Sequence, residues 1–153
     1  MKLPLDVLAA RWPRHTMTTM NDNPLHLHLN PHITTNYAVV LTALYLVMTL
    51  RVVYLRRSLK IAFGTEGSQS LMRTVRAHAN FSEYAPLSLL LLLLLEVTGL
   101  PNLALHALGA LLLVGRVTHA VGLTSRAKLR VVGMVLTLST LLLQIFFLLW
   151  LQR

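Results

Sequence analysis

Four long hydrophobic runs dominate the chain, and short polar segments separate them. The runs cover residues 36–59, 71–98, 103–123 and 127–150. Each is long enough to cross a bilayer as a helix, which takes about 20 residues. None alternates between apolar and polar positions as a membrane barrel strand does. The pattern therefore predicts an all-α integral membrane protein, a bundle of four helices.

The polar segments mark where the runs end. The segment KIAFGTEGSQS, which contains two glycines, follows the first run, and GLPN follows the second. The beginning of the chain differs, because it mixes proline, histidine, threonine and asparagine. Its one early apolar stretch, LPLDVLAA, is short and contains Asp6, which is not typical of a signal peptide. We predict an N-terminal tail at residues 1–35, disordered or lying on the surface, and a membrane domain at residues 36–153.

The composition agrees with a protein in lipid. Of 153 residues, 55% are hydrophobic and 12% are charged, whereas a typical soluble domain has a charged fraction of about 25%. The chain has no cysteine, so any thiol chemistry must use a thiol that arrives with a substrate. The tail histidines His26, His28 and His32 have no carboxylate or cysteine beside them, so we predict no metal site.

The net charge of +9 has a simple origin in the membrane topology. Lysine and arginine gather in the first and third connections and their flanks, whereas the second connection, TGLPN, has none. The positive-inside rule explains this distribution better than a nucleic-acid partner does. It predicts that the first and third connections face the cytoplasm and that both termini lie on the other side.

The second run carries polar residues on one helical face. Arg76, Asn80 and Glu83 are at positions i, i+4 and i+7, and Arg73 extends the same face by one turn. A charge in mid-bilayer costs roughly 2.5–3.5 kcal/mol, against about 0.5 kcal/mol gained by each leucine. We therefore expect these side chains to face another helix, a water-filled cavity or a polar ligand. A structural Arg–Glu pair between helices is the alternative.

Further cations enter the other runs. Arg116 and His119 are one turn apart in the third run, and Arg130 begins the fourth. The first run ends in RVVYLRRSLK, so every run brings cations to the same predicted side of the membrane. Cations with one glutamate suit an anionic ligand that also has an amine, because arginine binds carboxylates and a carboxylate binds ammonium.

Three other residues are given structural roles. Gly109 and Gly115 in the third run are predicted to be points of close helix packing. Glu96, at the far end of the second run, is expected to be an interfacial residue.

Three motifs follow one another along the second, third and fourth runs: RAHANFSEYAPL, GRVTHAVGL and AKLR. Together they resemble the MAPEG family (membrane-associated proteins in eicosanoid and glutathione metabolism). RAHANFSEYAPL is similar to the second-helix signature of the family, as in its leukotriene-C-forming member. GRVTHAVGL is similar to the third-helix segment of its prostaglandin-E-forming member, and AKLR to the arginine-bearing start of the fourth helix. The resemblance extends from about residue 37 to the C-terminal end.

The resemblance implies a homotrimer that holds glutathione between neighbouring protomers. It implies transferase or peroxidase chemistry on lipophilic small molecules, in a bacterial inner membrane with the site towards the cytoplasm. Arg130 is implied as the catalytic residue that keeps the glutathione sulfur as thiolate. Leu123 stands where the family often has a tyrosine, so the rim of the site differs. The implied glutathione ligands are Arg56, Arg57, Arg76, Asn80, Glu83, Tyr84 and His119.

The implied chemistry is physically reasonable. A free thiol has a pKa of about 8.5, and only its thiolate attacks well. Lowering that pKa by about two units takes about 2.7 kcal/mol. One arginine at about 4 Å, in an effective dielectric of about 20, supplies about 4 kcal/mol before desolvation. Conjugation, peroxide reduction and isomerisation stay open, because all three begin with the same thiolate.

Two other functions remain open from the residues alone. One is a non-enzymatic membrane protein whose polar cluster binds lipid head groups or stabilises the oligomer. The other is a small channel or transporter subunit that uses the basic cluster as an anion path. Glutathione binding separates both from the enzyme.

Overall fold

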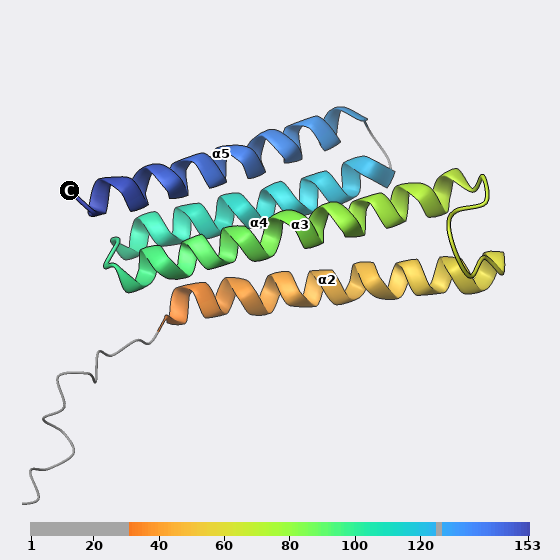
Figure 1. The fold of residues 1–153 in the computed structure, drawn as a ribbon, viewed down its shortest axis with the longest axis horizontal. Helices are drawn as coiled ribbons and strands as arrows, with labels where there is room; N and C mark the ends of the chain where they lie inside the picture. The colour runs from red at the N-terminus through yellow and green to blue at the C-terminus, as the bar shows by residue number, and fades with distance from the viewer. Residues whose placement is uncertain (1–30, 125–126) are drawn as a thin grey trace, which may run out of the picture. The chain divides into compact units, whose positions relative to one another are not determined.

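The part of the chain that the structure describes is a bundle of four helices, each antiparallel to the next (Figure 1). The structure, a computed structural model, describes residues 31–124 and 127–153. All four helices are long and apolar enough to cross a membrane. The prediction of an all-α membrane bundle is confirmed. The helices are α2 (His32–Leu59), α3 (Gln69–Val97), α4 (Asn102–Thr124) and α5 (Ala127–Leu151).

The helix ends agree with the predicted runs to within two residues, except at the start of α2. This helix begins at His32 rather than at residue 36, so residues 32–35, which we expected in the tail, form its first turn. Pro31 precedes this helix, and the other residues of the predicted tail, 1–30, lie outside the described residues. The end of α2, the start of α3, the end of α4 and the start of α5 lie at one end of the bundle, and the C-terminal end of α5 lies at the other (Figure 1).

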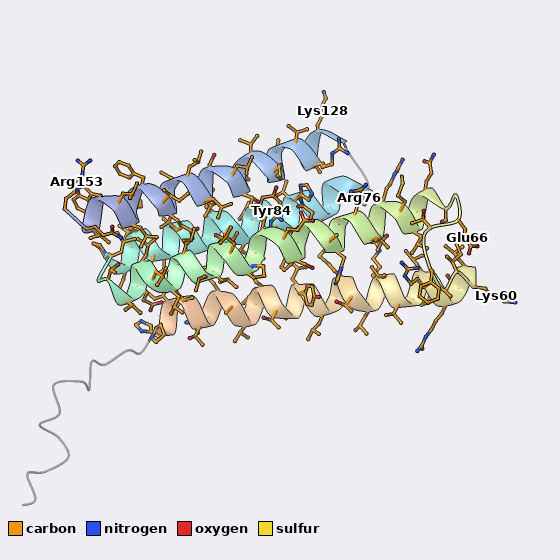
Figure 2. The ribbon with its side chains drawn as sticks, viewed as in Figure 1. Lys60, Glu66, Arg76, Tyr84, Lys128 and Arg153 are labelled. Carbon is orange, nitrogen blue, oxygen red and sulfur yellow. The ribbon has the colours of Figure 1, made fainter. Side chains whose placement is uncertain are left out.

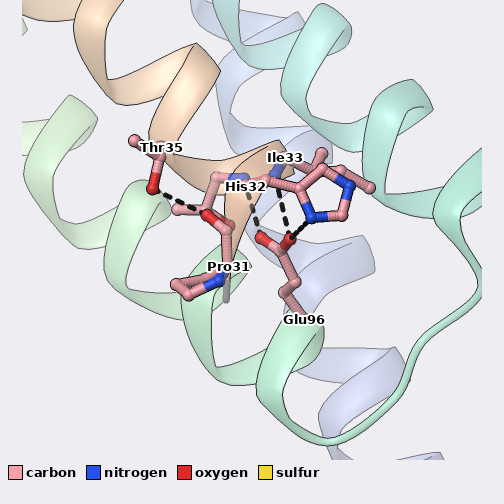
Figure 3. Close-up of polar contacts among 6 residues, drawn as sticks. Pro31, His32, Ile33, Thr35 and Glu96 are labelled. Atoms are coloured by element: carbon pink, nitrogen blue, oxygen red, sulfur yellow. Dashed lines mark hydrogen bonds and ion pairs between the residues drawn. The ribbon is translucent and has the colours of Figure 1, made fainter. Parts of the chain in front are cut away.

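Glu96, near the end of α3, caps the start of α2 (Figure 3). Its carboxylate accepts hydrogen bonds from the backbone N–H groups of Ile33 (2.9 Å) and Thr34 (2.7 Å), and His32 Nδ1 lies 3.9 Å from it. The first N–H groups of a helix have no partner within the helix and form its positive end, so a carboxylate is a favourable acceptor there. The expectation that Glu96 is an interfacial residue stays a prediction, and the structure adds this capping role.

The helices α4 and α5 approach closely because glycines line their contact. A Cβ atom on Gly115 would lie 2.9 Å from Thr137 Oγ1, and one on Gly122 would collide with the backbone of Arg130. From the other side, a Cβ atom on Gly133 would collide with the backbone of His119. Gly115 is therefore a point of close packing, as predicted, and the small residues bring the backbones of His119 and Arg130 together.

Large apolar side chains lie both inside and outside the bundle. Val39, Leu50 and Leu142 each expose 65% or more of their surface, which suits lipid and not water. Inside, Ser88 and Gln144 join α3 to α5 by two buried hydrogen bonds, of 2.8 and 3.0 Å. One buried apolar cluster contains Ile33, Leu92, Leu95, Leu100, Leu105 and Leu108. Another contains Leu41, Met48, Ala77, Phe81, Ala85 and Leu112.

Candidate functional site

A pocket of about 520 Å³ lies between α3, α4 and α5, towards the end of the bundle where α3 and α5 begin. Six of its eight lining residues are polar or charged, although all lie in helices that can span a membrane. Such residues in a membrane protein are costly to bury in lipid and usually mark a functional site. The lining residues are Met72, Arg73, Arg76, Ala79, Asn80, Glu83, His119 and Arg130.

One face of α3 forms most of the wall. The spacing of Arg73, Arg76, Asn80 and Glu83 by three or four residues aligns them along the helix. Arg76 and Glu83 are exposed, and Asn80 is half-buried. Among the described residues, no salt bridge joins Arg76 to Glu83. Within one protomer, the side chains of Arg76 and Glu83 therefore do not pair with each other in the described part of the chain.

His119 and Arg130 complete the pocket from α4 and α5. His119 Nδ1 lies 3.2 Å from the backbone oxygen of Arg130. Because a carbonyl oxygen can only accept, Nδ1 carries the hydrogen in this contact, and Nε2 of the neutral ring keeps its lone pair. The exposed side chain of Arg130 belongs to the first turn of α5, where the N–H groups also favour negative charge.

Arg116 lies behind the pocket and joins three helices. It is 1% exposed. Its Nε and Nη2 donate to Thr137 Oγ1 on α5 (3.1 and 2.8 Å), and its Nη1 donates to Asn80 on α3, to Oδ1 (3.0 Å) and to the backbone oxygen (3.2 Å). Its guanidinium carbon lies 5.6 Å from the centre of the Tyr84 ring, within range of a cation–π contact.

Five of the eight predicted site residues meet at this pocket: Arg76, Asn80, Glu83, His119 and Arg130. Helical spacing predicts Arg73 on this face as well, although the resemblance does not imply it as a glutathione ligand. Arg116 belongs to the same motif as His119, but it is buried against Thr137. A sequence motif cannot predict this contact, because Thr137 lies on another helix.

The other three predicted residues lie elsewhere. Tyr84 faces Arg116 and does not line the pocket. Arg56, at the end of α2, donates to the backbone oxygens of Ala62 (3.3 Å) and Gly64 (3.0 Å) in the following loop. Arg57 is exposed and does not line this pocket either. Their roles as ligands, at a site between protomers, stay predictions.

A second pocket, of about 450 Å³, lies between α2 and α3 and is mostly apolar. Its wall includes Tyr45 and Phe81, together with Ser82 and Pro86 on α3. These α3 positions belong to a different face from Arg76 and Glu83. Within the described residues, no group of three histidine, cysteine or acidic side chains is arranged to hold a metal ion; His26 and His28 lie outside them.

Comparison with known proteins agrees with this arrangement. A family model described as the MAPEG family matches residues 34–150, a range that includes every residue of the polar pocket. The protein called inner membrane protein YecN, from Escherichia coli strain K12, is 35% identical over 115 residues, which cover 74% of this chain and 88% of the relative. The same values hold for the protein of that name from Escherichia coli O6:H1 strain CFT073. These names state a location and no reaction.

Proposed function

Because the chain belongs to the MAPEG family, we propose that this integral membrane protein is a glutathione-dependent transferase or peroxidase of a bacterial inner membrane. It acts on lipophilic electrophiles and activates glutathione as the thiolate. The observation that supports this proposal is the polar pocket among membrane-spanning helices, where three arginines, one glutamate, one amide and one histidine meet.

The charges of the pocket complement those of glutathione. Arg73, Arg76 and Arg130 against Glu83 leave two net positive charges when His119 is neutral. Glutathione has two carboxylates and one ammonium, so its thiolate form carries two net negative charges. Arginine forks bind carboxylates, and the carboxylate of Glu83 binds the ammonium. A lipid head group with a single phosphate uses fewer of these groups.

Arg130 is the residue we assign to activation. Its guanidinium and the first N–H groups of α5 both favour the charged form of the sulfur. The thiolate then attacks the electrophile, a bond forms from sulfur to the electrophilic atom, and the leaving group departs with its electron pair. The apolar substrate reaches this site from the bilayer, where it is concentrated by partition.

The assembly and orientation belong to the same proposal. Arg56 and Arg57 are the two implied arginine ligands that do not line the pocket within one protomer. In a homotrimer with glutathione between protomers, a neighbouring copy would supply them to the ligand. Lys60, Arg76 and Lys128 lie towards one end of the bundle and Arg153 at the other (Figure 2). By the positive-inside rule, the end with more cations, and so the pocket, faces the cytoplasm.

Calorimetric titration of glutathione into detergent-purified protein tests the proposal. We expect saturable binding that Arg76→Ala weakens at least tenfold, since a hydrogen bond to a charged group contributes about 1.5–3 kcal/mol. Lys128→Ala, which removes an exposed cation outside the pocket, serves as the matched control and should bind normally. Absence of glutathione binding, together with binding of anionic lipid, would support the lipid-binding alternative instead.

A further inference from the structure

The amide of Asn80 is held in one orientation by a buried arginine. Asn80 lines the polar pocket, yet its Oδ1 accepts a hydrogen bond of 3.0 Å from Arg116 Nη1. Arginine has five N–H donors and no acceptor, so the amide atom that faces it must be the oxygen. The amide nitrogen, with its two hydrogens, is the part of the side chain left for the pocket.

Arg116 is itself fixed by a hydroxyl whose direction is also determined. The Thr137 hydroxyl donates to the backbone oxygen of Gly133 (2.9 Å), so its oxygen accepts from Arg116 Nε and Nη2. The hydrogen bonds therefore run one way, from Arg116 to Thr137 on one side and to Asn80 on the other. A flip of the Asn80 amide would place its N–H groups against a buried cation and would remove the hydrogen bond from Arg116 Nη1 to Oδ1, which is costly.

We propose that Arg116 is a positioning residue, which takes the side-chain oxygen of Asn80 and so makes Asn80 a donor-only group that recognises a carbonyl or carboxylate of the ligand. This inference rests on the proposed function for the identity of the ligand. It assigns Asn80 to an acidic or peptide oxygen of glutathione, whereas Glu83 takes the ammonium. It also gives a role to an arginine that does not touch the pocket.

The substitution Asn80→Asp separates the two roles of Asn80. Aspartate keeps an oxygen for Arg116 and neutralises a buried cation, but it removes both N–H donors. We expect the thermal midpoint to be maintained or raised, while glutathione affinity falls about 10- to 100-fold, as for the loss of a donor to a charged group. Gln144→Leu, which removes two buried α3–α5 hydrogen bonds away from the pocket, should lower the thermal midpoint and leave glutathione affinity within about twofold.

A double-mutant cycle tests whether Arg116 acts through Asn80. Arg116→Met should weaken glutathione binding about tenfold in the wild-type background and by less than about twofold in the Asn80→Ala background. If Arg116→Met does not fold, Thr137→Val replaces it, because valine keeps the size of threonine and removes the hydroxyl that accepts from Arg116. A purely structural role predicts additive losses in the two backgrounds.

The outcomes separate this inference from the proposed function. Normal glutathione affinity in Asn80→Asp, or additive losses in the cycle, would overturn the inference while the proposed function stands. No glutathione binding by the wild-type protein would overturn the proposed function and the ligand assigned to Asn80. In that case, the thermal midpoints of the same single and double mutants still test the contact between Arg116 and Asn80. Additive changes in the midpoint would show that the two residues do not act together and would overturn the inference.

Discussion

Replacing Arg130 by alanine should raise the pKa of bound glutathione and slow the reaction at neutral pH. Arg130 lines the pocket at the first turn of α5, and its side chain is exposed there. The interaction energy with a thiolate at about 4 Å lies between about 1 kcal/mol in water and about 4 kcal/mol in an effective dielectric of about 20. We take about 2.7 kcal/mol, equivalent to about two pKa units.

The size of the effect follows from the fraction of thiolate. At pH 7, a thiol with a pKa of about 8.5 is about 3% ionised, whereas one with a pKa of about 6.5 is about 76% ionised. Arg130→Ala should therefore lower the single-turnover conjugation rate about 25-fold at pH 7. At pH 9.5, both thiols are mostly ionised, so the deficit should shrink to less than about twofold.

The assay is conjugation of glutathione to an aryl halide, measured from pH 6 to 9.5 with saturating glutathione. Lys128→Ala is the matched control, because it removes an exposed cation from the same turn that does not line the pocket. Rates for Arg130→Ala within about twofold of wild type at pH 7 would refute the role of Arg130. A deficit that stayed constant with pH would show that Arg130 acts on something other than thiol ionisation.

Four further outcomes follow from the geometry. Glu83→Gln should weaken glutathione binding at least tenfold but leave N-acetylglutathione, which has no ammonium, unaffected; calorimetry with both ligands checks this, and equal losses would contradict it. Gly133→Ala places a Cβ atom against the backbone of His119 and should destabilise the bundle by about 1–3 kcal/mol, as overpacking does. Thermal unfolding in detergent measures this loss, and an unchanged midpoint would contradict the close approach of α4 and α5. Glu96→Ala removes the acceptor of two N–H groups at the start of α2 and should cost about 0.5–2 kcal/mol in the same assay, where an unchanged midpoint would show that the cap contributes nothing. Because the chain has no cysteine, Lys60→Cys gives a single reporter, which an impermeant maleimide should label only in inside-out vesicles; labelling in intact cells would invert the topology.

Much of the fold could be predicted because lipid imposes strong constraints on a sequence. Each hydrophobic run had to be a helix of spanning length, so the ends of α3, α4 and α5 were found to within two residues. The start of α2 was missed because its first turn, with His32 and Thr34, is polar. Its cap comes from Glu96 on α3, more than 60 residues away, and a local pattern cannot show such a partner.

The candidate site could also be predicted only in part from the sequence. Helical spacing aligned Arg76, Asn80 and Glu83 on one face, because that alignment is a local property of α3. Whether a residue faces the pocket or the core depends on how the helices pack. Arg116 and Tyr84 belong to the same motifs as the pocket residues, yet Arg116 is buried and lies over the ring of the half-buried Tyr84. That outcome depends on how α4 packs against α3 and α5, which only the three-dimensional arrangement reveals.

The most direct test of the central claim is ultraviolet difference absorbance in the thiolate band, with glutathione titrated into detergent-purified protein at pH 7. The proposal predicts a saturable thiolate signal, with about one thiolate for each occupied site, which Arg130→Ala loses. Absence of any thiolate signal in the wild-type protein at glutathione concentrations that saturate calorimetric binding would contradict the claim that this pocket activates glutathione.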